Sequence, residues 1–490
     1  MTICIASMLL ILFVGEDIWA QGGDDQIWTT PISLYEMPTD SYDHTIVADS
    51  TGRVHVFWGE SLEPEAVVGN MIMYRYWDGQ TWSPPTDILI APDDFKAPSW
   101  KPVAAVSSDG QIHLLWIGGF SGNVYYNSAR VDEAMSATAW GKPIKLAGGD
   151  YADIVIDNKD IIHAVITVRT GLDQGIFYLR SEDKGQSWSD PTLIPDTYLD
   201  PDVYVRQGRL AVGTDGTLHV SWWWTTDEFP PKGAMYLRST DEGKTWSNLL
   251  TMEGPIQALN VAAVGEQEVH LVWSSTSPER FKLYRWSNDG GRTWTPMIKW
   301  PQLGGFHGWT EMVVDSDGIL HLAMVASHYQ VKAERDEVLL HMQWNGKRWS
   351  EPEIILMNAQ IKGENQKNAA IAISEGNLVH LLVQYPLAAD QKRPYQYDIY
   401  YSRRRMNSSY VASQPLPTVT PMPSPTMTPT AKPTTTPTPR LAPAAIPDSF
   451  PSSTESLPSN PSFPILVAIG SVLAILIGVI LVHTAGSKWR

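Results

Sequence analysis

The sequence predicts an all-β protein built as a β-propeller, in which four-stranded antiparallel blades are arranged around an axis. Two repeats support this prediction. The first is a short apolar strand with a central histidine, and its copies are 50 to 59 residues apart, at His55, His113, His163, His219, His270, His321 and His380. The second is the frame Ser-x-Asp-x-Gly-x-x-Trp, which occurs at 181–188, 239–246 and 287–294. A long, steady period with several short strands in each copy is typical of radial β architectures.

Each copy of the longer repeat contains four strand signals. A short apolar strand precedes a Gly turn, the histidine strand follows, then an aromatic strand, and in most copies a strand of the Trp-x-x-Pro kind, such as Trp82–Pro85. We therefore predict seven blades, with six as the alternative. The last copy ends near Ser402 without its Trp-x-x-Pro strand, whereas Ile27–Ile32 resembles that strand. We expect this N-terminal strand to close the last blade and so to remove an exposed sheet edge.

The Ser-x-Asp-x-Gly-x-x-Trp frame suits a turn between two antiparallel strands. Its Asp carboxylate can accept backbone N–H groups, its Gly can adopt a conformation that other residues resist, and its Trp can anchor the next strand. We interpret these positions as structural, namely Ser181, Asp183, Gly185, Trp188, Ser239, Asp241, Gly243, Trp246, Ser287, Asp289, Gly291 and Trp294.

The two ends of the chain differ from its middle in composition. An apolar run within residues 1–20 predicts a signal peptide, with an uncleaved anchor as the alternative. Residues 21–413 form the predicted propeller, and 414–464 are rich in Pro, Thr and Ser, as in an extended stalk. The uncharged apolar run at 465–484 predicts a transmembrane helix, followed by a basic cytoplasmic tail at 485–490. We expect a single-pass protein of the cell membrane with an extracellular propeller.

Composition excludes some partners. The net charge of −17 and the pI of about 5.1 argue against nucleic acid, which requires basic surfaces. The repeated histidines do not indicate a metal, because rotational repetition places one on each blade and they cannot converge on one ion. We interpret them as packing residues with satisfied hydrogen bonds, and we expect neither a metal nor another cofactor.

Binding residues are expected in the longer, irregular loops at one end of the propeller. These loops contain aromatic side chains, which can stack on sugar rings, and arginines, which can bind hydroxyl or acidic groups. The ligand-binding candidates are Arg206, Arg280, Arg335, Arg393, Trp100 and Trp309. Lys101, Asp150, Tyr151 and Arg169 belong to the same loops.

The three frames, SEDKGQSW, STDEGKTW and SNDGGRTW, resemble the Asp boxes of the sialidase (neuraminidase) superfamily of β-propellers. The resemblance covers roughly residues 26–405. It implies six blades, three arginines that bind a sialic acid carboxylate, an Asp acid/base, and a Tyr nucleophile assisted by Glu. The chain lacks the family's Arg-Ile-Pro motif, and its seven repeats depart from six. If the chain is an enzyme, Arg206, Arg280, Arg335 and Arg393 are the candidate clamp, and Glu311 with Tyr395 is the candidate catalytic pair.

Three functions are consistent with these observations. The first is recognition of an extracellular glycan or glycoprotein, or of another extracellular ligand, without hydrolysis, favoured by the missing motif and the long stalk. The alternative is an exo-α-sialidase or another glycoside hydrolase that acts on extracellular glycoconjugates. A scaffold for protein contacts is the third.

Overall fold

The computed structural model describes residues 27–35, 41–61, 69–92, 97–169, 174–195, 202–227, 230–276, 280–305, 309–328, 337–356, 367–387 and 396–416. Its contacts divide the chain into two compact units, Met1–Val419 and Thr420–Arg490, and all the described residues belong to the first. The predicted signal peptide, the stalk beyond residue 416, the transmembrane helix and the tail lie outside the described residues. In the described part, no helix has the length and apolar character needed to cross a membrane.

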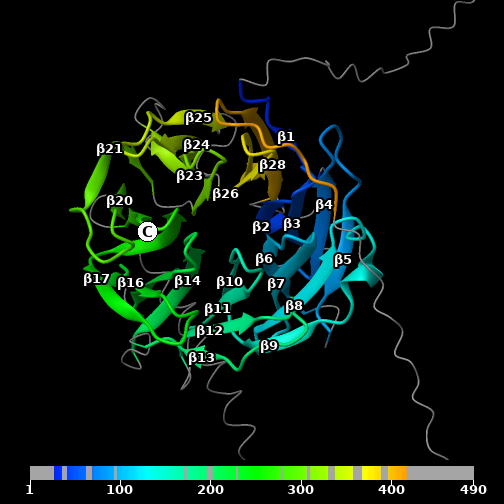
Figure 1. Cartoon of the computed structure of the whole chain (residues 1–490), viewed down its shortest axis with the longest axis horizontal. Helices are drawn as coiled ribbons and strands as arrows, with labels where there is room; N and C mark the ends of the chain where they lie inside the picture. Colours follow the sequence, from blue (N-terminus) through cyan, green and yellow to red (C-terminus); the bar gives the residue numbers. More distant parts are fainter. Residues whose placement is uncertain are drawn as a thin grey trace, which may run out of the picture. The chain divides into compact units, whose positions relative to one another are not determined.

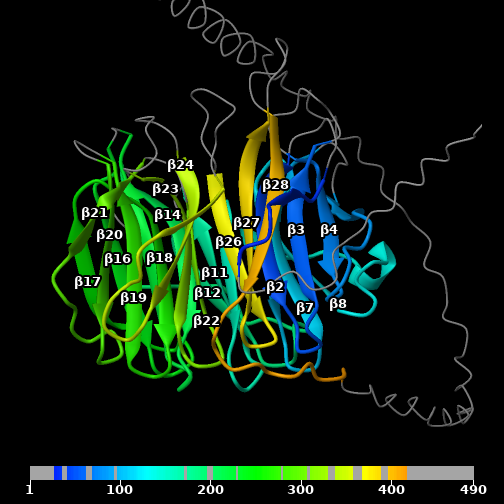
Figure 2. The same cartoon turned by 90° about the horizontal axis from the view of Figure 1, so that it is seen from above.

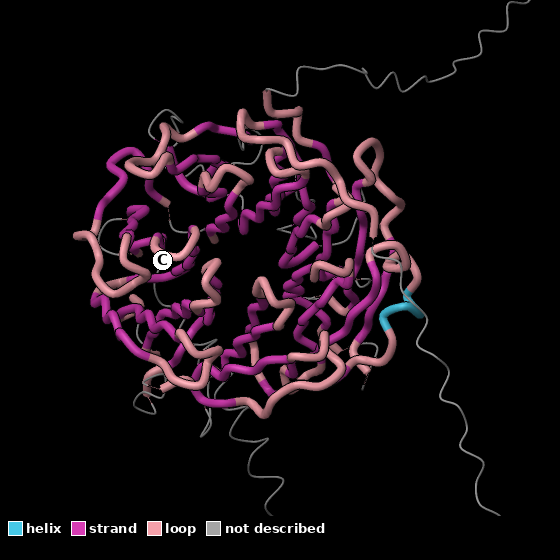
Figure 3. The backbone as a smooth tube through the Cα atoms, viewed as in Figure 1, coloured by secondary structure: helices cyan, strands magenta, loops and turns pink. Residues whose placement is uncertain are grey.

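The described chain is built almost entirely from strands, and its one helical segment there is the short 3-10 helix η1 (Ala137–Trp140), at the rim in Figure 3. Consecutive strands pair in sets of four, each called a blade here. The first three blades along the chain are β2 (Ser41–Ala48), β3 (Val54–Glu60), β4 (Met71–Trp77) and β5 (Thr86–Ile90); β6 (Ser99–Val106), β7 (Gln111–Gly118), β8 (Asn123–Arg130) and β9 (Ile144–Gly148); and β10 (Tyr151–Ile156), β11 (Ile162–Val168), β12 (Gly175–Ser181) and β13 (Thr192–Leu193).

The following blades have the same strand order. They are β14 (Tyr204–Val212), β15 (Leu218–Thr225), β16 (Gly233–Ser239) and β17 (Ser247–Glu253); β18 (Ile256–Val264), β19 (Glu268–Ser275), β20 (Phe281–Ser287) and β21 (Ile298–Gly304); and β22 (Thr310–Val314), β23 (Leu320–His328), β24 (Glu337–Trp344) and β25 (Glu353–Leu356). The last two of these blades pair with each other through β21 and β23, so they form one eight-stranded sheet.

The chain's final strands are β26 (Lys367–Ser374), β27 (Leu378–Leu387) and β28 (Gln396–Arg405). The N-terminal strand β1 (Ile32–Ser33) supplies their fourth partner, with Ile32 opposite Tyr401 and Ser33 opposite Tyr400. Next to it, the backbone N–H of Thr29 donates to the carbonyl oxygen of Arg403 at 3.0 Å. The predicted pairing of the N-terminal segment with the last blade is therefore confirmed.

The blades stand around a common axis, along which Figure 1 is viewed. The first strand of each blade lies nearest the axis, and these innermost strands are β2, β6, β10, β14, β18, β22 and β26. All-β structure and four-stranded antiparallel blades, both predicted from the repeats, are confirmed. The second strands are buried along nearly their whole length, as in β3 and β7, because each blade is covered on both faces by its neighbours.

The repeated histidines are buried and most are bonded to a side chain on the third strand of their own blade. The Nδ1 atom lies 2.6–2.8 Å from a tyrosine hydroxyl in five pairs, which are His55–Tyr74, His113–Tyr126, His163–Tyr178, His219–Tyr236 and His380–Tyr401. In the β22–β25 blade His341 replaces the tyrosine, 3.0 Å from His321. His270 differs, because it packs against Trp286, Trp344 and Trp349, is bonded to no tyrosine among the described residues, and lies 3.9 Å from the carboxylate of Glu268. The packing interpretation is confirmed, with His270 the exception for hydrogen bonding.

Each Asp box locks onto the tyrosine of the preceding blade. In the second box, Asp241 accepts the backbone N–H of Thr245 at 2.8 Å, and Ser239 Oγ accepts that of Gly243 at 2.9 Å. Gly243 lies at φ +80° with the ring of Tyr178 against its Cα, and Trp246 meets the same ring edge-on at 5.6 Å between centroids. The first and third boxes repeat the arrangement on Tyr126 and Tyr236. These contacts join each Asp box to the blade that precedes it.

The Asp boxes and the turns between first and second strands lie on one face of the ring, called the turn face. Lys184 in the first box, for example, binds Asp109 in the β6–β7 turn at 2.6 Å. After β28 the chain crosses this face as a strap, residues 406–416, visible along the lower edge in Figure 2. The strap bonds to the turns at Asp317, Glu375 and Ser50 in succession. Its last described side chain, Leu416, packs against Gly110 in a fourth turn.

Candidate functional site

A central channel runs along the axis and encloses a cavity of about 530 Å³. It is lined by the innermost strands of all the described blades, from β2 to β26. The end of the channel opposite the turn face is where the innermost strands begin, and it is called the mouth.

Two rings of side chains follow from the register of the innermost strands. The mouth ring contains the residue twelve positions before each repeated histidine, namely Asp43, Lys101, Tyr151, Gln207, Ala258, Trp309 and Asn368. The channel ring contains the residue ten positions before it, namely Thr45, Val103, Asp153, Arg209, Asn260, Glu311 and Ala370. Members of the channel ring all pair with the residue two positions after the histidine.

The mouth ring coincides with a recurring β-bulge. Five of its members, Asp43, Lys101, Gln207, Ala258 and Asn368, have φ between 32° and 52°, and the strand register shifts at each of them. A bulge bends its strand and redirects side chains, and bulges are common beside binding sites. A left-handed conformation at a residue other than glycine costs of order 1 kcal/mol or more. This costly conformation recurs at the same position on five blades, which indicates that the shape of the mouth depends on it.

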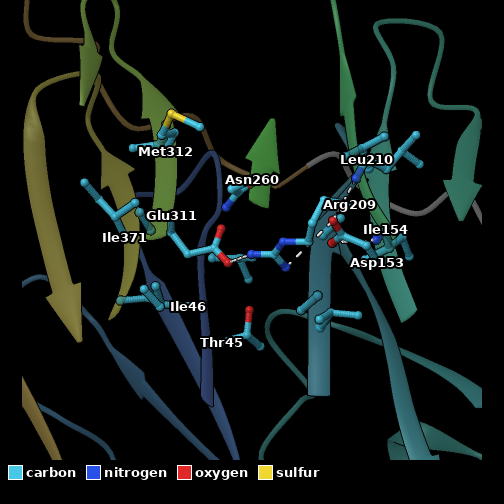
Figure 4. Close-up of a pocket in the computed structure, with 18 of the residues that line it drawn as sticks. Thr45, Ile46, Asp153, Ile154, Arg209, Leu210, Asn260, Glu311, Met312 and Ile371 are labelled. Carbon is cyan, nitrogen blue, oxygen red and sulfur yellow. Dashed lines mark hydrogen bonds and ion pairs between the residues drawn. The ribbon is translucent and has the colours of Figure 1, made fainter. Parts of the chain in front are cut away.

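The charged members of the channel ring, Asp153, Arg209 and Glu311, meet at the guanidinium of Arg209. Its Nη1 donates to the Tyr151 hydroxyl at 3.0 Å and lies 3.8 Å from Asp153 Oδ2, while its Nη2 donates to Glu311. Figure 4 shows Arg209 and Glu311 extending toward each other across the cavity from separate strands. Burial raises the pKa of Asp153, and the charge of Arg209 opposes that shift. One guanidinium is therefore shared by two carboxylates.

A second group of charges lies above the channel on the β6–β9, β10–β13 and β14–β17 blades. Arg169 pairs with Asp150 at 3.1 Å, and Lys101 donates to the carbonyl oxygen of Asp150 at 3.0 Å. Burial lowers the pKa of Lys101; the charges of Asp43 and Asp150 oppose this shift, and those of Arg169 and Arg206 add to it. Aromatic faces accompany these cations, because Lys101 lies 4.2 Å from the Trp100 ring and Arg206 lies 6.0 Å from the Trp223 ring.

The predicted site residues are only partly brought together. Trp100 and Arg206 join the charge group, whereas Trp309 and Glu311 line the channel. Arg280 is exposed and is not among the residues that line the channel. Arg335, Arg393 and Tyr395 lie outside the described residues. Within the described residues, no group of three or more His, Cys, Asp or Glu side chains is placed to hold a metal ion.

Sequence reasoning missed Arg209, Asp153 and Asn260, which share the channel ring with Glu311. A signal for them exists, since aligning the repeats on their histidines places all of them in one column. The Tyr151 hydroxyl, bonded to Arg209, also belongs to this network, and burial raises its pKa.

Comparison with known families identifies the fold. A family model described as the BNR repeat-like domain matches residues 68–353, more than half of the chain. The chain belongs to the BNR repeat-like family. This result confirms the Asp-box resemblance found in the sequence, and the match extends from just before β4 to the start of β25.

Several solved structures are similar to the chain. A protein of unknown function from Dyadobacter fermentans is 16% identical, with a TM-score of 0.47 over 78% of this chain and 100% of its own. The NanB sialidase of Streptococcus pneumoniae is 15% identical, with a TM-score of 0.42 over 75% and 68%. A Trypanosoma rangeli sialidase is 13% identical, with a TM-score of 0.41 over 77% and 58%. No curated protein matches the chain.

Proposed function

We propose that the chain is a membrane-anchored, sialidase-like propeller that recognises an extracellular glycan or glycoprotein, or another extracellular ligand, at its mouth without hydrolysing it. The observation that carries this proposal is the state of Glu311. A tyrosine nucleophile requires a neighbouring free carboxylate to activate it, but the Glu311 carboxylate is bound by the Arg209 guanidinium. Among the described residues, no tyrosine hydroxyl is hydrogen-bonded to Glu311.

The mouth has the chemistry of a sugar-binding surface. Trp100, Trp223 and Trp309 supply partly exposed aromatic faces, and the ring of Trp309 lies 5.5 Å from that of the buried Tyr151 between centroids. Rings of this kind stack on the apolar faces of sugars, while neighbouring charged groups bind their hydroxyls. The arrangement therefore combines both kinds of contact that a glycan requires.

The exo-α-sialidase alternative is favoured by a different observation. Lys101, Arg169 and Arg206 gather near Asp150, and Asp43 also acts on Lys101, so three cations against two carboxylates leave one positive charge for an acidic sugar. An enzyme of this kind would still require a tyrosine and a carboxylate free to act together. The third candidate is a scaffold for protein contacts.

Further parts of the proposal concern the whole chain. We propose seven blades, counting the eight-stranded sheet as two, and a ring completed by β1. The Pro, Thr and Ser-rich residues after 413 act as a stalk, 465–484 as the membrane anchor, and 1–20 as a signal peptide that directs the propeller outside the cell. Glycans on neighbouring molecules would then be within reach of the mouth.

The test uses the purified full-length chain on a glycan array and in parallel with a fluorogenic sialoside. Retention of particular glycans without release of the fluorophore supports recognition. Turnover that is lost in Arg206→Ala but kept in Arg403→Ala, an arginine of the last strand, contradicts it and supports the sialidase. Neither retention nor turnover leaves the protein scaffold as the function.

A further inference from the structure

The Arg209–Glu311 pair crosses the channel between blades that are not neighbours. Arg209 is on β14 and Glu311 is on β22, and the β18–β21 blade lies between them. The side chain of Arg209 is only 7% exposed, whereas that of Glu311 is 33% exposed. The guanidinium is thus fixed in the wall, and the carboxylate covers it from the cavity side.

Glu311 is held less firmly than the groups behind Arg209. Asp153 accepts the backbone N–H groups of Leu210 and Ile154, each at 3.0 Å, and Tyr151 is buried against Trp309. Glu311 is bonded to Arg209 and has no comparable backbone bonds among the described residues. Removing its charge would therefore change what Arg209 presents to the cavity, while Asp153 and Tyr151 keep Arg209 in place.

Charge in the channel ring opposes an acidic ligand. One guanidinium faces the carboxylates of Asp153 and Glu311, so the group carries a net negative charge when both are ionised. An acidic ligand would have to compete with Glu311 for Arg209 and would lie close to two like charges, a juxtaposition that costs several kcal/mol at an interface. On the other side of the cavity Thr45 directs its hydroxyl inward (Figure 4), and Val103 and Ala370 add no charge.

We propose that Glu311 is the specificity-determining residue of the channel: it closes the Arg209 guanidinium to acidic ligands, so that the channel takes neutral, hydroxyl-bearing sugars. This inference rests on the proposed glycan recognition and names its ligand class. Excluding the wrong ligand by an unfavourable charge is a common route to specificity. The carboxylate of Glu311 and the hydroxyl of Thr45 are both suited to bind sugar hydroxyls.

The experiment compares the full-length wild-type chain with Glu311→Gln, which keeps the shape of the side chain and removes its charge. Glu375→Gln is the matched control, because Glu375 is also a partly exposed carboxylate paired with an arginine, on the turn face. Each protein is assayed against neutral galactosides and N-acetylglucosaminides and against the corresponding sialosides and glucuronides on identical linkers. Near-UV circular dichroism checks folding, and Glu311→Ala serves as a second variant.

We expect the wild type and Glu375→Gln to retain a neutral glycan, and Glu311→Gln to gain at least tenfold in affinity for acidic glycans. The inference is overturned if wild type prefers acidic glycans in the channel, as shown by their loss in Arg209→Lys, or if both Glu311 variants gain nothing for acids. If wild type retains a neutral glycan in the second case, recognition stands and the role of Glu311 fails. Retention of no glycan by any variant overturns both proposals. A gain by Glu311→Gln without any wild-type retention supports the exclusion of acids by Glu311, but it overturns the proposed function and the neutral ligand class.

Discussion

The contact between an Asp-box glycine and the tyrosine of the preceding blade is open to a direct test by Gly243→Ala. A Cβ atom added there would lie 2.2, 2.4 and 2.8 Å from three ring atoms of Tyr178. That ring cannot withdraw easily, because its hydroxyl is 2.7 Å from His163 Nδ1 and donates to the Glu242 carbonyl oxygen at 2.9 Å. The substitution therefore forces either the ring or the Asp-box turn to move.

Gly318→Ala separates this clash from the cost of the backbone conformation. Gly318 has φ +79°, against +80° for Gly243, but an added Cβ would meet nothing within 4 Å. Both substitutions should lower the free energy of unfolding by about 1–2 kcal/mol, because a residue with a Cβ atom is strained in the left-handed conformation. Gly243→Ala should lower it by about 1–3 kcal/mol more, because the added atom overpacks the contact. Denaturant unfolding monitored by tryptophan fluorescence measures the two losses. Equal losses of stability in the two variants would refute the proposed locking of one blade onto the next.

Three further predictions concern the same framework. Tyr178→Phe should lower the free energy of unfolding by about 1–3 kcal/mol, because it leaves His163 and the Glu242 carbonyl without the tyrosine hydroxyl. The control is Tyr284→Phe, because Tyr284 has the matching register but is not bonded to its histidine. It should change little in the same denaturant assay, and similar losses in the two variants would contradict the role of the bond. Burial lowers the pKa of His219 from 6.5 to about 4. The unfolded chain therefore takes up a proton that the folded chain does not, and the free energy of unfolding falls by about 2 kcal/mol between pH 6.5 and pH 5. His219→Gln should flatten the dependence of the free energy of unfolding on pH between 6.5 and 4, and an unchanged slope would show that another group controls it. Leu416→Ala should lower stability by about 1 kcal/mol or more, because it removes apolar burial against the β6–β7 turn. Val411→Ala should lower it less, because the Val411 side chain is 48% exposed. Thermal unfolding compares the two variants, and equal shifts in melting temperature would argue against docking of the end of the strap.

Much of the fold was predictable because the spacing of the repeated histidines gives the length of each blade. A repeat that places His163 and His219 in the same register also places their partners, so strands, turns and the closing segment Ile27–Ile32 could be assigned from the chain alone. The reason for the histidine was less accessible. Its tyrosine lies 13 to 21 residues further along the chain, and the pairing emerges only when the second and third strands are placed side by side.

The candidate site was less predictable for a geometrical reason. Loop position identified Trp100, Arg206 and Glu311, but the partner of Glu311 is Arg209, 102 residues earlier in the chain. No local pattern reports a contact across the axis, which depends on how far the blades stand apart. The bulges at Lys101 and Gln207 also escape pattern reading, because neither residue favours a left-handed conformation on its own.

The strap has a mechanical consequence. A pull applied beyond Leu416 would first load hydrogen bonds that join the strap to several turns, at Ser50, Glu375 and Asp317, before it reached β28. Tension along the turn face shares the load among those bonds, whereas tension applied directly to the end of β28 would peel its strand pairs one after another. The strap therefore distributes a pull on the C-terminal side of the propeller over several turns. A propeller held by its C-terminal side could withstand drag on a bound ligand without opening where its first and last strands meet.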